Sequence, residues 1–336
     1  MVNPHVQGWM PFRQEKQVQC LGIDVSKDKF DVALLVDESN LEKFKQKSFS
    51  NDADGFGRLI IWLNARASEP VHFGMEATNT YWESLAEFLV DQGLLVSVIN
   101  PSLVKKEAQS WGMRNKTDKA DARVIARYCA AKSPQAWVAP SMEVRELRDL
   151  VRHLSCLQEE RQRHRNRLET VSSDAVRSSL EQLIVFLDEK ISDLENGISD
   201  HINRHPGIKS DADLLRSIPG IGDKTIAVIL SELPDVSNFR SAKSAVAYGG
   251  LSPRRVESGN YKGATRLCKF GNAKLRRALY FPAVVATRYN PLIREFYIRL
   301  RANGKCKMSA IGACLRKLLA IAYGVLRTGT PFRVPA

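Results

Sequence analysis

Carboxylate side chains are nearly missing from the C-terminal part of this 336-residue chain. After Gly250 only Glu257 and Glu295 carry one, and residues 211–336 hold 22 Lys and Arg against 7 Asp and Glu. Residues 1–210 hold 28 against 30, so the whole excess of positive charge is C-terminal. A region this basic attracts polyanions and binds them in a salt-dependent way, although a basic surface can also serve solubility alone.

Patterns typical of several other protein classes are missing too. The six cysteines are scattered singly without a Cys-x-x-Cys pair, which argues against a disulfide framework or a zinc site and predicts reduced cytoplasmic thiols. There is no Walker loop and no Gly-x-Ser-x-Gly elbow. Residues 1–16 lack the apolar stretch of a signal peptide, and Arg316 and Lys317 interrupt the apolar run at 311–326. We therefore expect neither export nor membrane insertion.

Histidine gives little support for a metal site. His201 and His205 have i, i+4 spacing, but no third ligand is evident in the sequence. This spacing therefore favours a solvated helix end over a zinc site.

Strand and helix patterns alternate between residues 19 and 140. Hydrophobic periodicity predicts strands at 20–25, 30–36, 47–50, 71–75 and 94–99, and helices at 57–67, 79–91, from Pro101, and at 118–131 with Thr117 as N-cap. Three hairpin-linked strands followed by alternating helices and strands are the order of an α/β ribonuclease H-like fold. The proline-bracketed segment from Pro134 to Pro140 predicts a domain boundary.

The apolar pattern of residues 142–202 is typical of coiled-coil helices. Glycine and proline are scarce there, and apolar residues recur in steps of three and four, from Val144 to Leu154 and again from Leu180 to Ile198. A charged middle at 159–167 and a cap-like Ser172-Ser173-Asp174 predict two helices that fold back or dimerise, rather than one rod. An ordinary intramolecular helical hairpin is the alternative.

Four acidic residues of the first region suit a metal site: Asp24, Glu76, Asp118 and Asp121. Asp24 interrupts an apolar strand, Glu76 ends another, and the two aspartates share one face of a predicted helix. In a ribonuclease H-like sheet the first and fourth strands are neighbours, so Asp24 and Glu76 can converge. Carboxylate oxygens suit Mg²⁺ or Mn²⁺, and one or two ions would bind a scissile phosphate.

Plainer explanations exist for single acids in this region. An Asp pair at a helix start is often a cap or a solvated face. Asp28 and Asp31 are explained without a metal, by a turn and by an outward strand face.

The basic C-terminal region contains two elements that suit DNA handling. Residues 214–230 are two apolar helical segments joined by Gly220-Ile-Gly222, followed by Lys224, which is the form of a helix-hairpin-helix phosphate element, or else of a structural αα turn. Ser258 then lies in a loop among cations: Arg254, Arg255, Lys262, Arg266, Lys269, Lys274, Arg276 and Arg277. Cations polarise a phosphate for attack by a hydroxyl, whereas Ser258 taken alone is more often a turn residue.

Five motifs together resemble the IS110-family transposases: Gly-Ile-Asp24-Val-Ser-Lys, Met-Glu76-Ala-Thr, Lys-Thr-Asp118-Lys-Ala-Asp121-Ala, Ile-Pro-Gly-Ile-Gly222 and Tyr-Gly-Gly-Leu-Ser-Pro. The resemblance spans about residues 19–326. It implies a RuvC-like Asp-Glu-Asp-Asp domain, a coiled coil and a transposase domain whose serine attacks DNA and forms a phosphoserine, as in serine recombinases. Ser258 matches that serine, with Ser252 as second choice.

The resemblance also implies partners. The active site is expected to combine the acidic domain of one subunit with the serine domain of another, in a homo-oligomer such as a dimer or tetramer. A structured noncoding RNA encoded by the element is expected to guide the protein to donor and target DNA. Asn79 and Asn260 stand where glycine is common in the family, which concerns loop geometry more than chemistry.

These observations predict four segments: an extension at 1–18, a RuvC-like domain at 19–140, a coiled coil at 141–206 and a transposase domain at 207–336. The predicted activity is metal-dependent DNA cleavage and exchange in a bacterial or archaeal cytoplasm, at the nucleoid. The alternatives are a RuvC-like, structure-specific nuclease that uses water as nucleophile, and a nucleic-acid-binding protein without activity.

Overall fold

The chain divides at Pro140 into two compact units, residues 1–139 and 140–336. The computed structural model describes residues 18–37, 42–68, 70–111, 118–254, 257–258, 261–262 and 266–334, and gives the backbone alone for 118–119, 257–258 and 261–262. Thr117 and Arg255, predicted as an N-cap and a phosphate ligand, lie outside the described residues.

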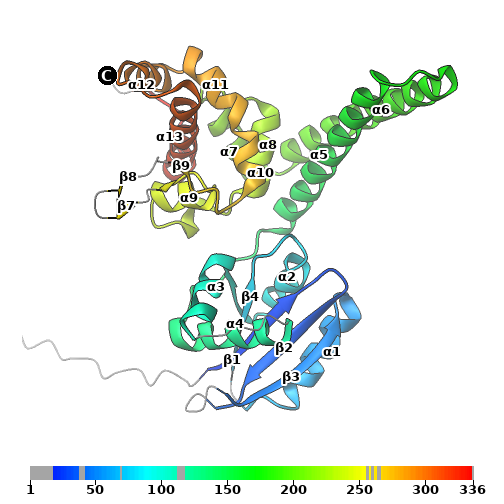
Figure 1. Cartoon of the computed structure of the whole chain (residues 1–336), viewed down its shortest axis with the longest axis vertical. Coiled ribbons are helices and arrows are strands. Elements are labelled where there is room, and N and C mark those ends of the chain that lie inside the picture. The colour runs from blue at the N-terminus through cyan, green and yellow to red at the C-terminus, as the bar shows by residue number, and fades with distance from the viewer. Residues whose placement is uncertain are drawn as a thin grey trace, which may run out of the picture. The chain divides into compact units, whose positions relative to one another are not determined.

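The first unit is a mixed α/β fold, as the sequence predicted (Figure 1). Its described elements are β1 (Gln19–Val25), β2 (Lys29–Leu35), β3 (Phe44–Ser50), α1 (Ala53–Asn64), β4 (Val71–Glu76), α2 (Glu83–Asp91), β5 (Leu95–Ile99), α3 (Pro101–Ser110) and α4 (Asp118–Lys132). They form a five-stranded sheet in the order β3-β2-β1-β4-β5. β1, β2 and β3 pair antiparallel, whereas β4 and β5 add in parallel on the other side of β1.

Successive strand residues point to two faces of this sheet, and both faces are covered. One face packs against α1 and α2 through a core that includes Leu21, Phe30 and Phe73. The other face carries Cys20 and packs against α3 and α4. Because both faces are buried, the central strands read as nearly continuous apolar runs in the sequence.

Two helices begin away from their predicted starts. α1 begins at Ala53 because Asp52 Oδ1 accepts a hydrogen bond from the Gly55 amide at 2.8 Å, which caps the helix. α2 begins only at Glu83, because Asn79 has φ +55° and so cannot belong to a right-handed helix.

The second unit is mainly helical. Its described elements are α5 (Met142–Leu168), α6 (Asp174–Arg204), α7 (Pro206–Arg216), α8 (Asp223–Glu232), the 3₁₀ helix η1 (Val236–Asn238), α9 (Ala242–Tyr248), β6 (Pro253–Arg254), β7 (Glu257–Ser258), β8 (Tyr261–Lys262), β9 (Arg266–Leu267), α10 (Ala273–Ala278), α11 (Tyr280–Tyr289), α12 (Pro291–Ala302) and α13 (Lys307–Thr328). The four short strands were not predicted.

The helices α5 and α6 form an antiparallel hairpin that extends away from the rest of the second unit (Figure 1). Arg161 and Arg165 of α5 both pair with Asp188 of α6, and Arg165 Nη2 lies 3.1 Å from Asp188 Oδ2. Within one chain, therefore, the seam is that of an intramolecular hairpin. At its base, Leu147 and Val151 join the core of the second unit.

The helix α13 is by length and composition apolar enough to cross a membrane. In the structure, however, it contributes Cys314, Leu318 and Ala322, all fully buried, to the core of the second unit. Arg316 and Lys317 of the same helix stay partly exposed. This burial is typical of a core helix, in agreement with the prediction that the run does not enter a membrane.

Candidate active site and nucleic-acid interface

The register of β1 and β4 brings Asp24 and Glu76 together. The strands run parallel with Gly22 opposite Gly74 and Ile23 opposite Met75, so the next pair in register is Asp24 and Glu76. Both residues follow their strands' buried stretch and are half-buried. Because alternate residues share a face, both positions lie on the face that carries Gly22 and Gly74.

The helix α4 lies directly on that face. A Cβ atom at Gly22 would lie 2.0 Å from the carbonyl oxygen of Ala122 and 2.4 Å from the amide nitrogen of Ala126. One at Gly74 would lie 2.2 Å from Cys129 Sγ. These contacts require glycine at both positions, because any side chain would push the helix away from the sheet.

The contacts also give the direction of α4 over the sheet. Cys129 packs in one cluster with Cys20, and Ala122 packs on Gly22, two residues further along β1. The helix therefore runs against β1, and its first turn lies over the strand ends that carry Asp24 and Glu76. Asp121 precedes Ile125, a buried residue on the sheet-facing side, by one turn, and is half-buried.

The backbone thus brings the four predicted acids to one edge of the sheet. The side chain of Asp118 lies outside the description, but its position is one turn before Ala122, on the same helix face. Among the described side chains, no three Asp, Glu, His or Cys residues lie close enough to hold a metal ion. The side chains of Asp24, Glu76 and Asp121 therefore do not form a metal-binding group in this structure, although their oxygen donors suit Mg²⁺ or Mn²⁺ by chemistry.

A short loop holds Glu76 and explains one departure from the family pattern. Thr78 Oγ1 donates a hydrogen bond of 2.6 Å to Glu76 Oε1, and Trp82 Nε1 donates one of 3.1 Å to the carbonyl of Asn79. With φ +55°, Asn79 occupies the left-handed region that glycine adopts most easily. Asparagine tolerates this region better than most residues, so the loop keeps its turn without glycine.

The sequence explanation of Asp31 was wrong. We predicted that it lies on an outward strand face, but it is buried, with 3% of its surface exposed. It pairs with Asp24 across β1 and β2, so it shares the face that α4 covers. Ser48 Oγ donates a hydrogen bond to it, and Lys29 Nζ lies 3.0 Å away, so its carboxylate is neutralised locally.

In the second unit, Ser258 belongs to the serine loop, which we define as residues 252–267. Its backbone pairs with Tyr261 in the β7–β8 ladder, while Pro253 and Arg254 pair with Leu267 and Arg266 in the β6–β9 ladder. Figure 1 shows β7 and β8 standing away from the helices of this unit. The side chain of Ser258 lies outside the description, whereas Ser252, the second choice, is half-buried at the root of the loop.

The root of the serine loop is tightly closed. Three backbone hydrogen bonds join its two sides, from Asn272 N to the Tyr248 carbonyl at 2.7 Å, from Lys269 N to Gly250 at 3.0 Å and from Cys268 N to Ser252 at 2.8 Å. Gly271 has φ +137°, and a Cβ there would lie 2.2 Å from the Tyr248 carbonyl oxygen.

The predicted phosphate ligands fall into two groups. Arg254, Arg266 and Lys269 are exposed, and the Lys262 side chain lies outside the description. The others have protein partners: Lys224 with Glu195, Lys274 with Glu232, Arg277 with Glu159, and Arg276 with the carbonyl of Gly249. Burial lowers the pKa of Arg276. The first group is therefore better placed to bind a polyanion.

The glycine turn between α7 and α8 forms as predicted. Gly220 has φ +103°, and a Cβ there would lie 2.9 Å from that of Ala286, so helix packing already requires this glycine. Gly222 is exposed and begins α8 with open space around it. The exposed Asp223 stands at the same helix start and pairs with Arg216 at 2.8 Å, which opposes anion binding there.

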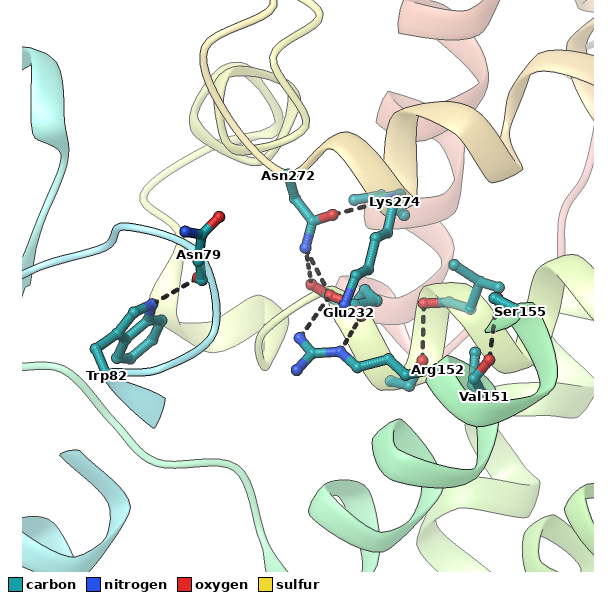
Figure 2. A network of polar contacts seen from close by, with 11 residues as sticks. Asn79, Trp82, Val151, Arg152, Ser155, Glu232, Asn272 and Lys274 are labelled. Carbon is teal, nitrogen blue, oxygen red and sulfur yellow. Dashed lines mark hydrogen bonds and ion pairs between the residues drawn. The ribbon is translucent and has the colours of Figure 1, made fainter. Parts of the chain in front are cut away.

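Sequence reasoning missed one buried acid, Glu232 at the end of α8. Arg152 Nε lies 2.7 Å from Glu232 Oε1, and Asn272 Nδ2 donates a 2.8 Å bond to Oε2 (Figure 2). Burial raises the pKa of Glu232, but Arg152, Asn272 and Lys274 outweigh it, so the pKa lies below its usual value. The available signal was an acid within an apolar helix segment, Ile-Leu-Ser-Glu.

Comparison with known proteins identifies the family. Residues 21–173 match a family model described as a transposase, and residues 212–298 match the transposase IS116/IS110/IS902 family. The pilin gene-inverting protein of Moraxella bovis is 35% identical over 93% of this chain and 97% of its own length. The chain belongs to the IS110 family of transposases.

More distant relatives also match. An IS110 protein of 43.6 kDa from Streptomyces coelicolor is 31% identical over 50% of the chain and 41% of its own length. The transposase of IS1111A from Coxiella burnetii is 20% identical over 82% of the chain and 80% of its own length. The predictions of a transposase, of DNA recombination and of DNA as a partner are thereby confirmed at the level of the family.

Proposed function

We propose that the chain cuts and rejoins DNA through a covalent phosphoserine at Ser258, with Asp24, Glu76, Asp118 and Asp121 at the same phosphate. The observation that carries this proposal is the β1–β4 register under α4, which brings acids distant in the sequence to one sheet edge. The strand order and the two covered faces support a ribonuclease H-like, RuvC-like first unit.

The four acids suit a hard divalent cation, Mg²⁺ or Mn²⁺. Asp24 and Glu76 would hold it from the sheet, and Asp118 and Asp121 from α4. When bound, such an ion stabilises negative charge on phosphate oxygens. The half-burial of Asp24, Glu76 and Asp121 leaves these carboxylates accessible from solvent, while strand and helix packing fix their backbone.

The proposed step exchanges one phosphate ester for another. The Ser258 hydroxyl loses its proton and attacks phosphorus, the Oγ–P bond forms, and a P–O bond of the DNA backbone breaks. The departing sugar oxygen takes up a proton. Because one phosphate ester bond replaces another, the number of such bonds is conserved. A sugar hydroxyl can therefore attack the phosphoserine and rejoin DNA without an energy source. The exposed Arg254 and Arg266 flank Ser258 in the serine loop and would bind the DNA backbone.

Partners and outcome follow from the same scheme. Because Ser258 and the acids belong to different units of the chain, a site assembled from two subunits is proposed, in a dimer or tetramer. A structured RNA from the element is proposed as the guide. The Moraxella bovis relative is named as an inverter of the pilin gene, and cutting with rejoining at two sites would serve inversion as well as transposition.

Trapping the adduct tests the nucleophile. The full chain is incubated with Mg²⁺, the RNA of its own element and DNA carrying the element junction, then denatured and digested, and the modified residue is mapped by mass spectrometry. We expect a DNA adduct on Ser258 that Ser258→Ala abolishes and Ser252→Ala leaves intact. An adduct on another residue contradicts the assignment.

A RuvC-like nuclease is the alternative function, favoured by the acid edge, which could serve a water nucleophile equally well. In that case Ser258→Ala would still cut DNA, and no adduct would form.

Under either function, Asp24→Asn should abolish cutting while leaving DNA affinity within about twofold, since the cations of the second unit supply most of the attraction. A protein that only binds nucleic acid would show no cutting to lose.

A further inference from the structure

We propose that Glu232 is a positioning residue that holds the root of the serine loop and thereby places Ser258 for attack. The inference rests on the proposed role of Ser258. It concerns Arg152 and Asn272 as well, since these two side chains connect Glu232 to α5 and to the loop root (Figure 2).

Glu232 is the centre of a small polar cluster within an apolar core. Its side chain is 3% exposed and lies at the end of α8. Arg152 of α5 reaches both carboxylate oxygens, from Nε at 2.7 Å and from Nη2 at 3.3 Å. Lys274 of α10 lies 3.7 Å away on the more exposed side. Arg152 of α5 therefore holds the Glu232 carboxylate in place.

Asn272 connects this carboxylate to the loop. Its Nδ2 donates to Glu232 Oε2 at 2.8 Å, its Oδ1 accepts from the Leu275 amide at 2.9 Å and caps α10, and its backbone amide donates to the Tyr248 carbonyl at 2.7 Å. An acceptor at Glu232 requires the Nδ2 end of the amide to face it. The Oδ1 end then points at α10 and accepts from the Leu275 amide, so Glu232 and this cap together fix the orientation of the Asn272 side chain.

The loop root transmits this orientation because it has no free space. A Cβ at Gly250 would lie 3.0 Å from the carbonyl oxygen of Phe270, and one at Gly271 would lie 2.6 Å from the amide nitrogen of Gly250. The two sides of the root thus touch through backbone atoms, and the Arg276 guanidinium fills the remaining space, with Nη1 2.5 Å from the Gly250 Cβ position. A shift of Asn272 would move Gly271 and with it the paired strands β6 and β9 at the base of the serine loop.

Stability alone is a poor reason for this acid. Replacing a buried ion pair by apolar residues of similar size often leaves stability unchanged or raises it. What an apolar pair cannot supply is the carboxylate acceptor for Asn272 Nδ2, which would keep only its longer contact, 3.4 Å, with the backbone carbonyl of residue 232. Removing Arg152 and Glu232 together therefore separates a role in stability from a role in positioning Asn272.

The test uses the double variant Arg152→Met, Glu232→Leu in the full chain. Single-turnover DNA cleavage at saturating DNA, DNA affinity, melting temperature and hydrogen exchange of the Cys268, Lys269 and Asn272 amides are measured. We expect unchanged melting and affinity, faster exchange of the three amides, and cleavage slower by a factor on the order of 10 to 100, as for a misplaced reacting group. Asn272→Ser keeps a cap for α10 but does not reach Glu232, and should show the same pattern.

Asp188→Asn is the matched control, because Asp188 also ties α5 to another helix by two arginines but lies in the hairpin, away from the loop. It should leave the cleavage rate per bound DNA unchanged. The proposal is overturned if the double variant and Asn272→Ser keep both the wild-type rate and the amide protection, or if their rate falls only in step with melting temperature. The exchange readout does not depend on the nucleophile, so a failure of Ser258→Ala to stop cleavage would refute the proposed function separately.

Discussion

At the scale of residues, two glycines determine how closely α4 approaches the acidic edge. Gly22 and Gly74 face each other in the β1–β4 register, and backbone or side-chain atoms of α4 occupy the space where their side chains would be. The sequence shows them only as glycines inside apolar strands. Their role follows from the helix that packs on them, whose first turn lies over the end of β1.

Gly22→Ala should unfold or loosen the first unit. The added carbon would meet the Ala122 carbonyl oxygen at 2.0 Å, so α4 must shift, at a cost of at least about 2 kcal/mol. Gly57→Ala is the control: it lies inside α1 with nothing within 4 Å, and should stabilise by about 0.5–1 kcal/mol. Urea unfolding measures both, and equal effects of the two changes would contradict the packing argument.

His72 should make the first unit sensitive to acid. Burial lowers its pKa from the usual 6.5, and its Nε2 lies 2.8 Å from Ser97 Oγ. The unfolded chain therefore takes up a proton at His72 more readily than the folded chain. Neutral His72 costs the folded state nothing above pH 6.5, and the free energy of unfolding falls as the pH drops from 6.5 toward the lowered pKa. His72→Gln keeps a donor for Ser97 and should reduce the loss of stability between pH 7.5 and 5.5, measured by urea midpoints. An equal loss in both proteins would exclude His72 as the cause.

At the scale of elements, the hairpin of α5 and α6 has ion pairs between its two helices and also exposes apolar side chains to solvent. Arg161, Arg165 and Asp188 join the two helices, whereas Val185 and Phe186 of α6 are 68% and 54% exposed. We propose these two neighbouring apolar side chains as part of a contact with another subunit. The heptad pattern alone left folding back and dimerisation open, because both bury the same kind of seam.

Val185→Lys with Phe186→Lys should weaken association of the proposed oligomer. Both side chains are exposed in the single chain, so the change should leave its melting temperature within about 2 °C, since surface substitutions usually stay within about 0.5 kcal/mol. Sedimentation velocity over a concentration series should show a shift toward monomer. An unchanged distribution would place the subunit contact elsewhere.

At the scale of the whole molecule, charge is divided along the chain. The acids of the proposed metal site belong to a part with 28 Lys and Arg against 30 Asp and Glu, whereas the serine loop belongs to a part with 22 against 7. A cluster of carboxylates in a nearly neutral part of the chain can bind a cation. A strongly basic part can bind the nucleic-acid backbone. The two functions need opposite fields, so their location in different parts of the chain is physically reasonable.

Arg254→Ala combined with Arg266→Ala should lower the salt dependence of DNA binding. If each arginine contacts one phosphate, the slope of log affinity against log salt should fall by about 1 per residue. Arg58→Ala, in α1 and paired with Asp54, should leave the slope unchanged. Fluorescence titrations at several salt concentrations measure it, and an unchanged slope in the double variant would remove the serine loop from the interface.

The sequence by itself determined the mixed α/β first region, the helical second region, the break near Pro140 and the acids at strand ends. Local periodicity, glycine and proline placement and charge carry that information. The family could be inferred as well, because its motifs are contiguous short segments.

Only the tertiary structure decided the rest. The burial of Asp31, the ion pairs of Lys224 and Arg277, and the cluster around Glu232 all join residues far apart in the chain. A one-dimensional pattern states whether a side chain is charged, but its partner depends on how helices and strands pack. For the same reason, Gly22 was visible in the sequence while the helix that requires it was not.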